Sequence, residues 1–177
     1  GEKMDLIVSV DENWGIGNNG QLLAKISSDL KRFRKMTTGN IIIMGRKTLE
    51  SFPEGKPLPN RINIVMTHSQ EYTCEGVKVC HNVQEVLRTI HKEKQKYVFV
   101  VGCASIYQQF LQYCERAYVK KIYQTFVADT YFKNLDKDYH WKLIEQQPIQ
   151  EENGIKYAYL TYENQQYQQN AVKQKIV

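Results

Sequence analysis

Short apolar runs recur through the N-terminal two thirds of the chain, and each ends in a turn of glycine, hydroxyl or small residues. The runs span residues 6–10, 41–44, 62–66 and 97–101. Runs this short and this continuously apolar are typical of strands buried on both faces of a parallel sheet. Parallel strands are joined by helical crossovers, so the pattern restricts the chain to a sheet covered by helices.

Helical and alternating patterns fill the segments between and after these runs. Leu30, Phe33 and Met36 share the inward face of a predicted helix that Ser27 caps. Further helices are expected at 48–51, 83–91 and 106–111, and further strands at 76–80, 117–126, 141–147 and 156–162. We therefore predict an α/β fold: a mixed, largely parallel central sheet with helices on both faces and an antiparallel C-terminal end.

The segment 11–20 follows the first strand and is rich in glycine and asparagine. Gly15, Gly17 and Gly20 spell G-x-G-x-x-G, but a dinucleotide fingerprint needs a helix that opens on the third glycine. Residues 21–26 intervene here, which excludes that interpretation. We expect a mobile loop that covers a ligand.

Asp29 lies in the first turn of the predicted helix, beside apolar residues. Burial would raise its pKa and the helix dipole would lower it, so the carboxylate could be tuned to hold a cationic or hydrogen-bond-donating ring. Acids in first turns are also common because they complement the dipole. The stretch by itself leaves both interpretations open.

Polar and glycine-rich turns follow the strands at 45–48, 67–69 and 102–105. The carboxyl ends of parallel strands meet at one edge of a sheet, where ligands bind in such folds. Gly45-Arg46-Lys47-Thr48 would present backbone N–H groups and two cations, which suits phosphate, although an ordinary turn with solvated basic residues has the same composition. Small residues at 102–105 would let a ligand approach the backbone.

Length and composition bound the remaining possibilities. The 177 residues suit one domain at 4–162, followed by a Gln-rich tail at 163–177 that we expect to be disordered. We expect no membrane span and no secretory signal, hence a cytoplasmic protein. The cysteine and histidine spacings predict neither a metal site nor disulfides, and a net charge of +5 fits a small anionic ligand.

Six segments together carry a resemblance to a known family. They are 8–17, Asp29-Leu30-x-x-Phe33, 43–48, 57–61, Ile106-Tyr107 and Ala128-Asp129-Thr130-x-Phe132. In this order and spacing, the chain resembles dihydrofolate reductases of the bacterial chromosomal type from Met4 to about Tyr162.

The resemblance implies hydride transfer from NADPH to C6 of 7,8-dihydrofolate, with protonation at N5. Asp29 would be the catalytic acid, holding the pterin amino group and N3 and promoting N5 protonation through water. Arg61 would bind a carboxylate of the glutamate tail. The implied substrate-binding residues are Ile7, Val8, Leu30, Phe33, Leu58, Arg61, Val101 and Tyr107. Antifolate inhibitors would bind the same site, and the enzyme would act as a monomer.

The resemblance also implies a cofactor site. Arg46, Thr67 and His68 would hold the 2′-phosphate of NADPH, and Lys47 with Thr48 would bind the pyrophosphate together with the 102–105 turn. Ile16, Val101 and Tyr107 would border the nicotinamide. The full implied cofactor set is Ser9, Ile16, Gly45, Arg46, Lys47, Thr48, Thr67, His68, Gly102, Cys103, Ala104, Ser105, Ile106 and Tyr107.

Four positions depart from the family pattern. The family usually has a cis Gly-Gly where this chain has Gly102-Cys103, and Pro-Trp where it has Leu23-Ala24. Ser9 replaces a common alanine. Lys120 replaces the threonine partner of the acid, and we expect its side chain to point outward, away from Asp29.

Three other functions fit parts of the pattern. A riboflavin-pathway reductase of the same fold would use NADPH on a different pyrimidine, but the combination of Asp29 and Arg61 argues against it. The departures at Cys103 and Lys120 suggest a nucleotide-binding module without catalysis. A nucleic-acid binder would fit the charge, but basic and aromatic residues are not interleaved.

Overall fold

The computed structural model describes residues 3–22, 27–93 and 96–166, and the side chains at 21–22 and 27–29 lie outside that description. Within these ranges nine strands form the main sheet, in the order β10-β12-β8-β1-β7-β4-β5-β6 with β11 beside β12. The parallel strands are β1 (Met4–Val10), β4 (Ile41–Gly45), β5 (Ile62–Met66), β6 (Val77–Cys80), β7 (Val98–Val100) and β8 (Arg116–Ile122).

The antiparallel end consists of β10 (Trp141–Gln146), β11 (Gln150–Glu152) and β12 (Ile155–Asn164). Strand β12 runs two residues past 162, where we expected the domain to end. The predicted fold class is confirmed, because β8 joins a parallel block to this antiparallel block.

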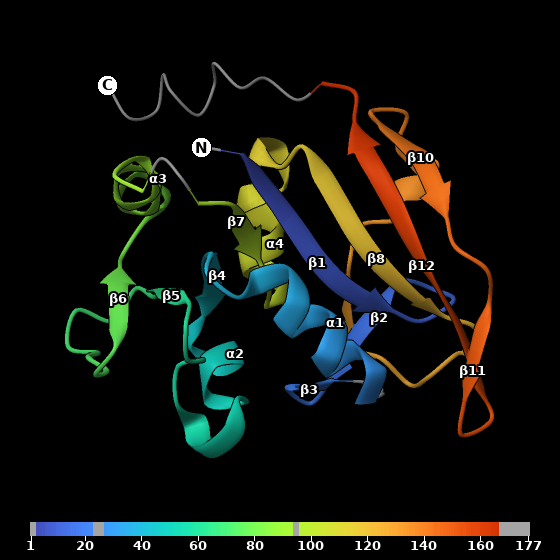
Figure 1. Ribbon diagram of the computed structural model, residues 1–177, viewed down its shortest axis with the longest axis horizontal. Coiled ribbons are helices and arrows are strands. Elements are labelled where there is room, and N and C mark those ends of the chain that lie inside the picture. The colour runs from blue at the N-terminus through green and yellow to red at the C-terminus, as the bar shows by residue number, and fades with distance from the viewer. Residues whose placement is uncertain (1–2, 23–26, 94–95, 167–177) are drawn as a thin grey trace.

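Helices cover both faces of the sheet (Figure 1). Alternate strand residues point to opposite faces, so the continuous apolar runs supply two separate cores. The larger cluster packs against α3 (Val83–His91) and α4 (Ala104–Phe110). The smaller cluster packs against α1 (Ser27–Thr37) and α2 (Arg46–Glu50).

Three local expectations are wrong. Helix α1 begins at Ser27, the residue expected to be its cap. The segment 11–20 contains a strand, β2 (Gly15–Asn18), which forms a small sheet with β3 (Gln21–Leu22) and β9 (Thr130–Tyr131). Strand β8 ends at Ile122 instead of Phe126, and beyond that end the Phe126 N–H donates 3.1 Å to the Asp11 carboxylate.

The described segments contain no helix with both the length and the apolar character needed to cross a membrane. Each of the cysteines, all within the described ranges, is a free thiol.

Asp5 is a buried acid at the amino end of β1, on the edge of the sheet opposite the glycine turns. Its side chain is 3% exposed and accepts a 2.9 Å hydrogen bond from the Arg116 N–H. Burial raises its pKa to about 6, although the charge of Lys3 and this hydrogen bond oppose the rise. Because the pKa of Asp5 is higher in the folded protein than its ordinary value of 3.8, protonation of Asp5 favours the fold. This stabilisation is complete at pH values below 3.8 and is lost as the pH rises through 6.

Asp5→Asn is therefore expected to raise the free energy of unfolding at pH 7 by up to about 3 kcal/mol, because it removes a buried charge while keeping an acceptor for Arg116. The gain should disappear near pH 4, where Asp5 itself is neutral. Urea unfolding at both pH values measures this, with exposed Glu71→Gln as the control. An equal gain at both pH values would contradict the assignment.

Candidate active site at the carboxyl edge of the sheet

The ends of β4 and β7 meet through two glycines. The Gly45 N–H donates a 2.9 Å hydrogen bond to the Gly102 carbonyl. A Cβ added at Gly45 would lie 3.2 Å from Cys103 Sγ, and one at Gly102 would lie 3.2 Å from Thr48 Oγ1. Gly102 also has a φ of +127°, and the Gly102-Cys103 peptide bond is cis. A side chain at either glycine would therefore crowd the neighbouring turn, and the φ of Gly102 disfavours any other residue there.

Helices α2 and α4 begin directly after these turns. Their N-cap residues, Gly45 and Cys103, make no side-chain cap hydrogen bond. The first N–H groups of both helices are therefore left for other acceptors, as in an anion site. In the first turns of these helices Lys47 and Ser105 are exposed, and Thr48 and Ala104 are half-buried. This part of the expected cofactor set is brought together.

The three residues expected at the 2′-phosphate lie on neighbouring strand ends. Gly45 pairs with Met66 in the β4–β5 ladder, which places the following residues, Arg46 and Thr67, side by side. His68 is exposed next to them. Arg46 also has an internal partner that the sequence analysis missed: its Nε lies 3.0 Å from Glu50 Oε2 in an exposed pair. The i,i+4 spacing is the signal that could have revealed it.

The guanidinium of Arg46 also lies 4.8 Å from the centroid of the Tyr72 ring. An exposed ion pair is weak, since water screens both charges. Glu50 therefore holds Arg46 only weakly.

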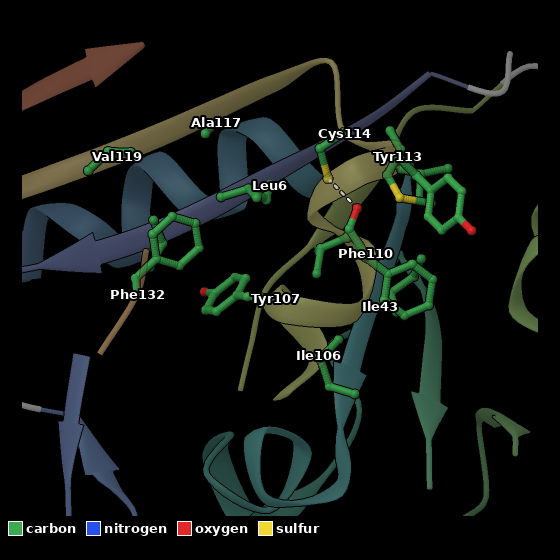
Figure 2. Close-up of a cluster of buried hydrophobic side chains, with 14 of the residues drawn as sticks. Leu6, Ile43, Ile106, Tyr107, Phe110, Tyr113, Cys114, Ala117, Val119 and Phe132 are labelled. Carbon is green, nitrogen blue, oxygen red and sulfur yellow. Dashed lines mark hydrogen bonds between the residues drawn. The ribbon is translucent and has the colours of Figure 1, made fainter. Parts of the chain in front are cut away.

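Tyr107 connects α4 to the central strand β1. Its hydroxyl donates a 2.7 Å hydrogen bond to the Ile7 carbonyl, and its ring contacts Phe132 edge-on at 5.2 Å. Figure 2 shows this ring beside Phe132, with Ile106 on the same helix. Burial, with smaller effects of nearby thiols, raises the pKa of Tyr107 far above its usual value. The hydroxyl is therefore a permanent hydrogen-bond donor that fixes α4 against β1.

Several of the expected substrate residues gather on the face of the sheet that α1 covers. Ile7, Phe33, Leu58 and Val101 all pack on the smaller cluster. Val8 does not join them: it points to the opposite face and packs in the larger cluster, as Ile16 does. Half-buried Ser9 shares the face of Ile7, because the two alternate with Val8 along β1.

Leu30 does not lie on the inward face of α1. It is 72% exposed, whereas Phe33 and Met36 pack on the smaller cluster. The expectation was wrong because helical spacing shows which residues share a side of the helix, not how far along the helix the neighbouring core extends.

Asp29 lies in the first turn of α1, as expected. Its side chain is outside the described structure, and so is the 23–26 segment with Leu23-Ala24. The backbone of α1 therefore gives its position, one turn before Arg32 and Phe33.

Arg61 is held beside the C-terminal end of α1. Its Nε donates 3.0 Å to the Pro59 carbonyl, and its Nη1 lies 3.4 Å from the buried Thr37 hydroxyl. Burial and the nearby charge of Arg34 lower its pKa. Among the described acidic side chains none forms an ion pair with Arg61. The oriented guanidinium has further N–H groups for a carboxylate.

Lys120 points inward, contrary to the expectation. It is 2% exposed, on the face of β8 that also carries Tyr118. The expectation was wrong because Lys120 follows the alternation of β8, whose even-numbered residues, Tyr118 among them, lie on the face of the sheet that α1 covers.

Asp11 organises the loop between β1 and β2, a role that was not predicted from the sequence. It is 1% exposed and accepts 2.8 Å hydrogen bonds from the N–H groups of Asn13 and Gly15. It accepts a third at 3.1 Å from Phe126. This role could have been predicted from the sequence, because Asp11 is an acid that directly follows a buried strand and begins a loop rich in turn residues.

A second acid links the same loop to the segment before β9. The Asn19 N–H donates 2.9 Å to Asp129 Oδ2, and the Thr130 hydroxyl donates 2.8 Å to the same carboxylate. These hydrogen bonds, that of Asn19 first, lower the pKa of Asp129. Both acids tie the glycine loop to residues more than 100 positions away, so the loop is positioned by the fold.

Asp11→Ala is expected to lower the free energy of unfolding by about 3 kcal/mol, since three backbone donors lose an acceptor that is itself only 1% exposed. Asp11→Asn, which keeps one carbonyl oxygen, should lose less. Asp129→Ala serves as the exposed control. Urea unfolding of the three variants measures the difference, and equal losses for Asp11→Ala and Asp129→Ala would refute the anchoring role.

No cluster of three or more histidine, cysteine, aspartate or glutamate residues suited to a metal ion is found in the part of the chain that the structure describes.

Comparison with known proteins gives one consistent result. The sequence profile of the family described as dihydrofolate reductase matches residues 3–164. A dihydrofolate reductase of Bacillus subtilis (strain 168) is 37% identical over 162 residues, covering 90% of this chain and 94% of the relative. One of Aedes albopictus is also 37% identical, covering 92% and 97%.

A solved structure agrees in fold. Dihydrofolate reductase from Enterococcus faecalis, complexed with NADP(H) and RAB-propyl, superposes with a TM-score of 0.80 at 30% identity, covering 92% of this chain and 96% of the other. The strand order, the paired glycine turns and the sequence matches over residues 3–164 together place this chain in the dihydrofolate reductase family.

Proposed function

We propose that this chain catalyses the NADPH-dependent reduction of 7,8-dihydrofolate to 5,6,7,8-tetrahydrofolate, which supplies one-carbon metabolism. Family membership over residues 3–164 carries the proposal. The Enterococcus faecalis dihydrofolate reductase, whose structure is a complex with NADP(H), supports NADPH as the cofactor.

The glycine turns fit a dinucleotide. A Cβ at Gly45 or Gly102 would crowd the neighbouring turn, and the first N–H groups of α2 and α4 have no side-chain cap. Pyrophosphate binds at these N–H groups, with Lys47, Thr48 and the 102–105 turn around it. Arg46, Thr67 and His68 bind the 2′-phosphate, and Arg46 exchanges Glu50 for it.

The substrate lies on the face of the sheet that α1 covers. When bound, NADPH supplies the hydride that C6 of the pterin receives. Asp29 holds the pterin amino group and N3 and promotes protonation at N5 through water. Ile7, Phe33, Leu58 and Val101 form the apolar wall, and exposed Leu30 closes over the ring when it binds. Arg61 binds the glutamate tail.

Every one of these residues lies between Met4 and Tyr162, so we propose a monomer made of a single domain over 4–162. Antifolates compete for the pterin site. Free thiols suit a reducing compartment, which supports the cytoplasm as the location. Scattered basic residues and a net charge of +5 argue for small anionic ligands over nucleic acid.

The test is the loss of NADPH absorbance after addition of 7,8-dihydrofolate to the purified protein, with NADH and a substrate-free reaction as controls. Rapid loss with NADPH, and slower loss with NADH, is the expected result. Binding of NADPH without turnover would favour the non-catalytic module, and turnover of a riboflavin-pathway pyrimidine instead would favour that reductase.

A further inference from the structure

Tyr72 lies in the segment between β5 and β6 and contacts one of the residues assigned to the 2′-phosphate of NADPH. Its half-buried ring packs on the smaller hydrophobic cluster, as Cys74 does. The guanidinium carbon of Arg46 lies 4.8 Å from the centroid of this ring. A guanidinium within about 6 Å of a ring centroid is attracted by the negative face of the ring. The ring is therefore anchored in the core and attracts Arg46 from there.

Arg46 has little else to orient it. It is the first residue of α2, its side chain is 51% exposed, and its Nε lies 3.0 Å from Glu50 Oε2. Glu50 is exposed as well, so water screens this ion pair. The guanidinium makes no other hydrogen bond with the residues that the structure describes. Its remaining N–H groups are available to a phosphate.

The strand register places Arg46 next to Thr67. Gly45 pairs with Met66 in the β4–β5 ladder, and the residues that follow this pair lie side by side. Thr67 is itself held in place, because its carbonyl lies 3.0 Å from His81 Nδ1. A flexible arginine loses side-chain freedom when it binds a phosphate. A contact that already restrains it in the free protein reduces that loss.

We propose that Tyr72 is a positioning residue for the 2′-phosphate of NADPH, whose ring holds the Arg46 guanidinium beside Thr67 before the cofactor binds. The inference deepens the proposed function and rests on Arg46 and Thr67 binding that phosphate. Because the arginine is restrained in advance, Tyr72 strengthens the binding of NADPH. NADH lacks the phosphate, so Tyr72 contributes nothing to its binding. Tyr72 thereby takes part in the selection of NADPH over NADH.

The ring of Tyr72, and not its hydroxyl, has this role. Burial, with smaller effects of Cys74, raises the pKa of Tyr72. The hydroxyl is therefore neutral at pH 7 and offers Arg46 no negative charge. A phenylalanine would present the same kind of ring face. Removal of the ring and removal of the hydroxyl should therefore have different consequences.

The test compares the dissociation constants of the full chain for NADPH and NADH, measured by fluorescence titration. Tyr72→Leu removes the ring but keeps an apolar side chain, and Tyr72→Phe keeps the ring. We expect Tyr72→Leu to raise the Kd for NADPH by about 3- to 10-fold, the range of a partly exposed cation–π contact, and to leave the Kd for NADH nearly unchanged. Tyr72→Phe should match the wild type with both. Tyr139→Leu, at an exposed tyrosine outside the site, is the matched control and should change neither constant.

A double-mutant cycle with Arg46→Leu tests the partner. In the Arg46→Leu background, Tyr72→Leu should have no further effect on NADPH binding. Additive losses would overturn the proposal. So would equal weakening of NADPH and NADH by Tyr72→Leu, which is the result that loss of core packing alone would give. In steady-state kinetics, Tyr72→Leu should raise the KM for NADPH and leave kcat nearly unchanged.

If Tyr72→Leu does not fold, NMR of the wild type decides. The Cδ protons of Arg46 lie near the face of an aromatic ring, so its ring current should shift them upfield in the free protein and in the NADPH complex. Unshifted protons in the complex would overturn the proposal, as would a wild type that binds NADPH and NADH equally well. The binding measurements need no turnover. A wild type that selects NADPH but does not reduce dihydrofolate would refute the proposed function alone.

Discussion

Asp29→Asn is expected to reduce the rate of hydride transfer by about 100-fold or more at neutral and high pH, the range that proton delivery by a positioned acid contributes. The loss should shrink at low pH, where solvent protonates N5 directly. NADPH affinity should be nearly unchanged, because the residues assigned to the phosphates of the cofactor follow β4, β5 and β7 and not α1. Single-turnover kinetics with NADPH over a range of pH measures the rate, and fluorescence titration measures the affinity.

Asp5→Asn is the matched control, since it makes the same chemical change in β1 instead of α1. Asp5 is buried at the amino end of β1, away from the glycine turns, and its substitution should leave turnover intact. If Asp29→Asn weakened NADPH binding as much as hydride transfer, or if its loss were the same at every pH, Asp29 would not be the acid of the pterin site.

Arg61→Leu is expected to raise the KM for dihydrofolate by about 10- to 100-fold, the range for a lost charge-assisted pair of hydrogen bonds, with a small effect on kcat. The guanidinium is already oriented by the Pro59 carbonyl and the Thr37 hydroxyl. The tail is bound equally tightly in the ground state and in the transition state, so the substitution should raise KM and leave kcat nearly unchanged. Steady-state kinetics measures both constants.

The substrate provides the control for this variant. Dihydropteroate lacks the glutamate, so its KM should be nearly the same for wild type and Arg61→Leu. Arg34→Leu, a change at the neighbouring exposed arginine, should have a smaller effect on dihydrofolate. An unchanged KM for dihydrofolate in Arg61→Leu would eliminate Arg61 as the tail-binding residue, and an equal rise for both substrates would indicate structural damage.

The sequence determined the sheet and the edge at which the site forms. Apolar runs at 41–44 and 62–66 became β4 and β5, and their following turns lie side by side as predicted. These features could be predicted from the sequence because buried strands and glycine turns follow from local chemistry, and the meeting of parallel strand ends follows from chain direction.

Tertiary structure alone decided how single side chains are used. Lys120 is buried, Leu30 is exposed, and Asp11 holds the backbone of a segment more than 100 residues away. Each outcome depends on which element packs against the residue and how far that element extends. Local pattern fixes which residues share a face, but burial, hydrogen-bond partners and charge environment arise only when distant segments meet.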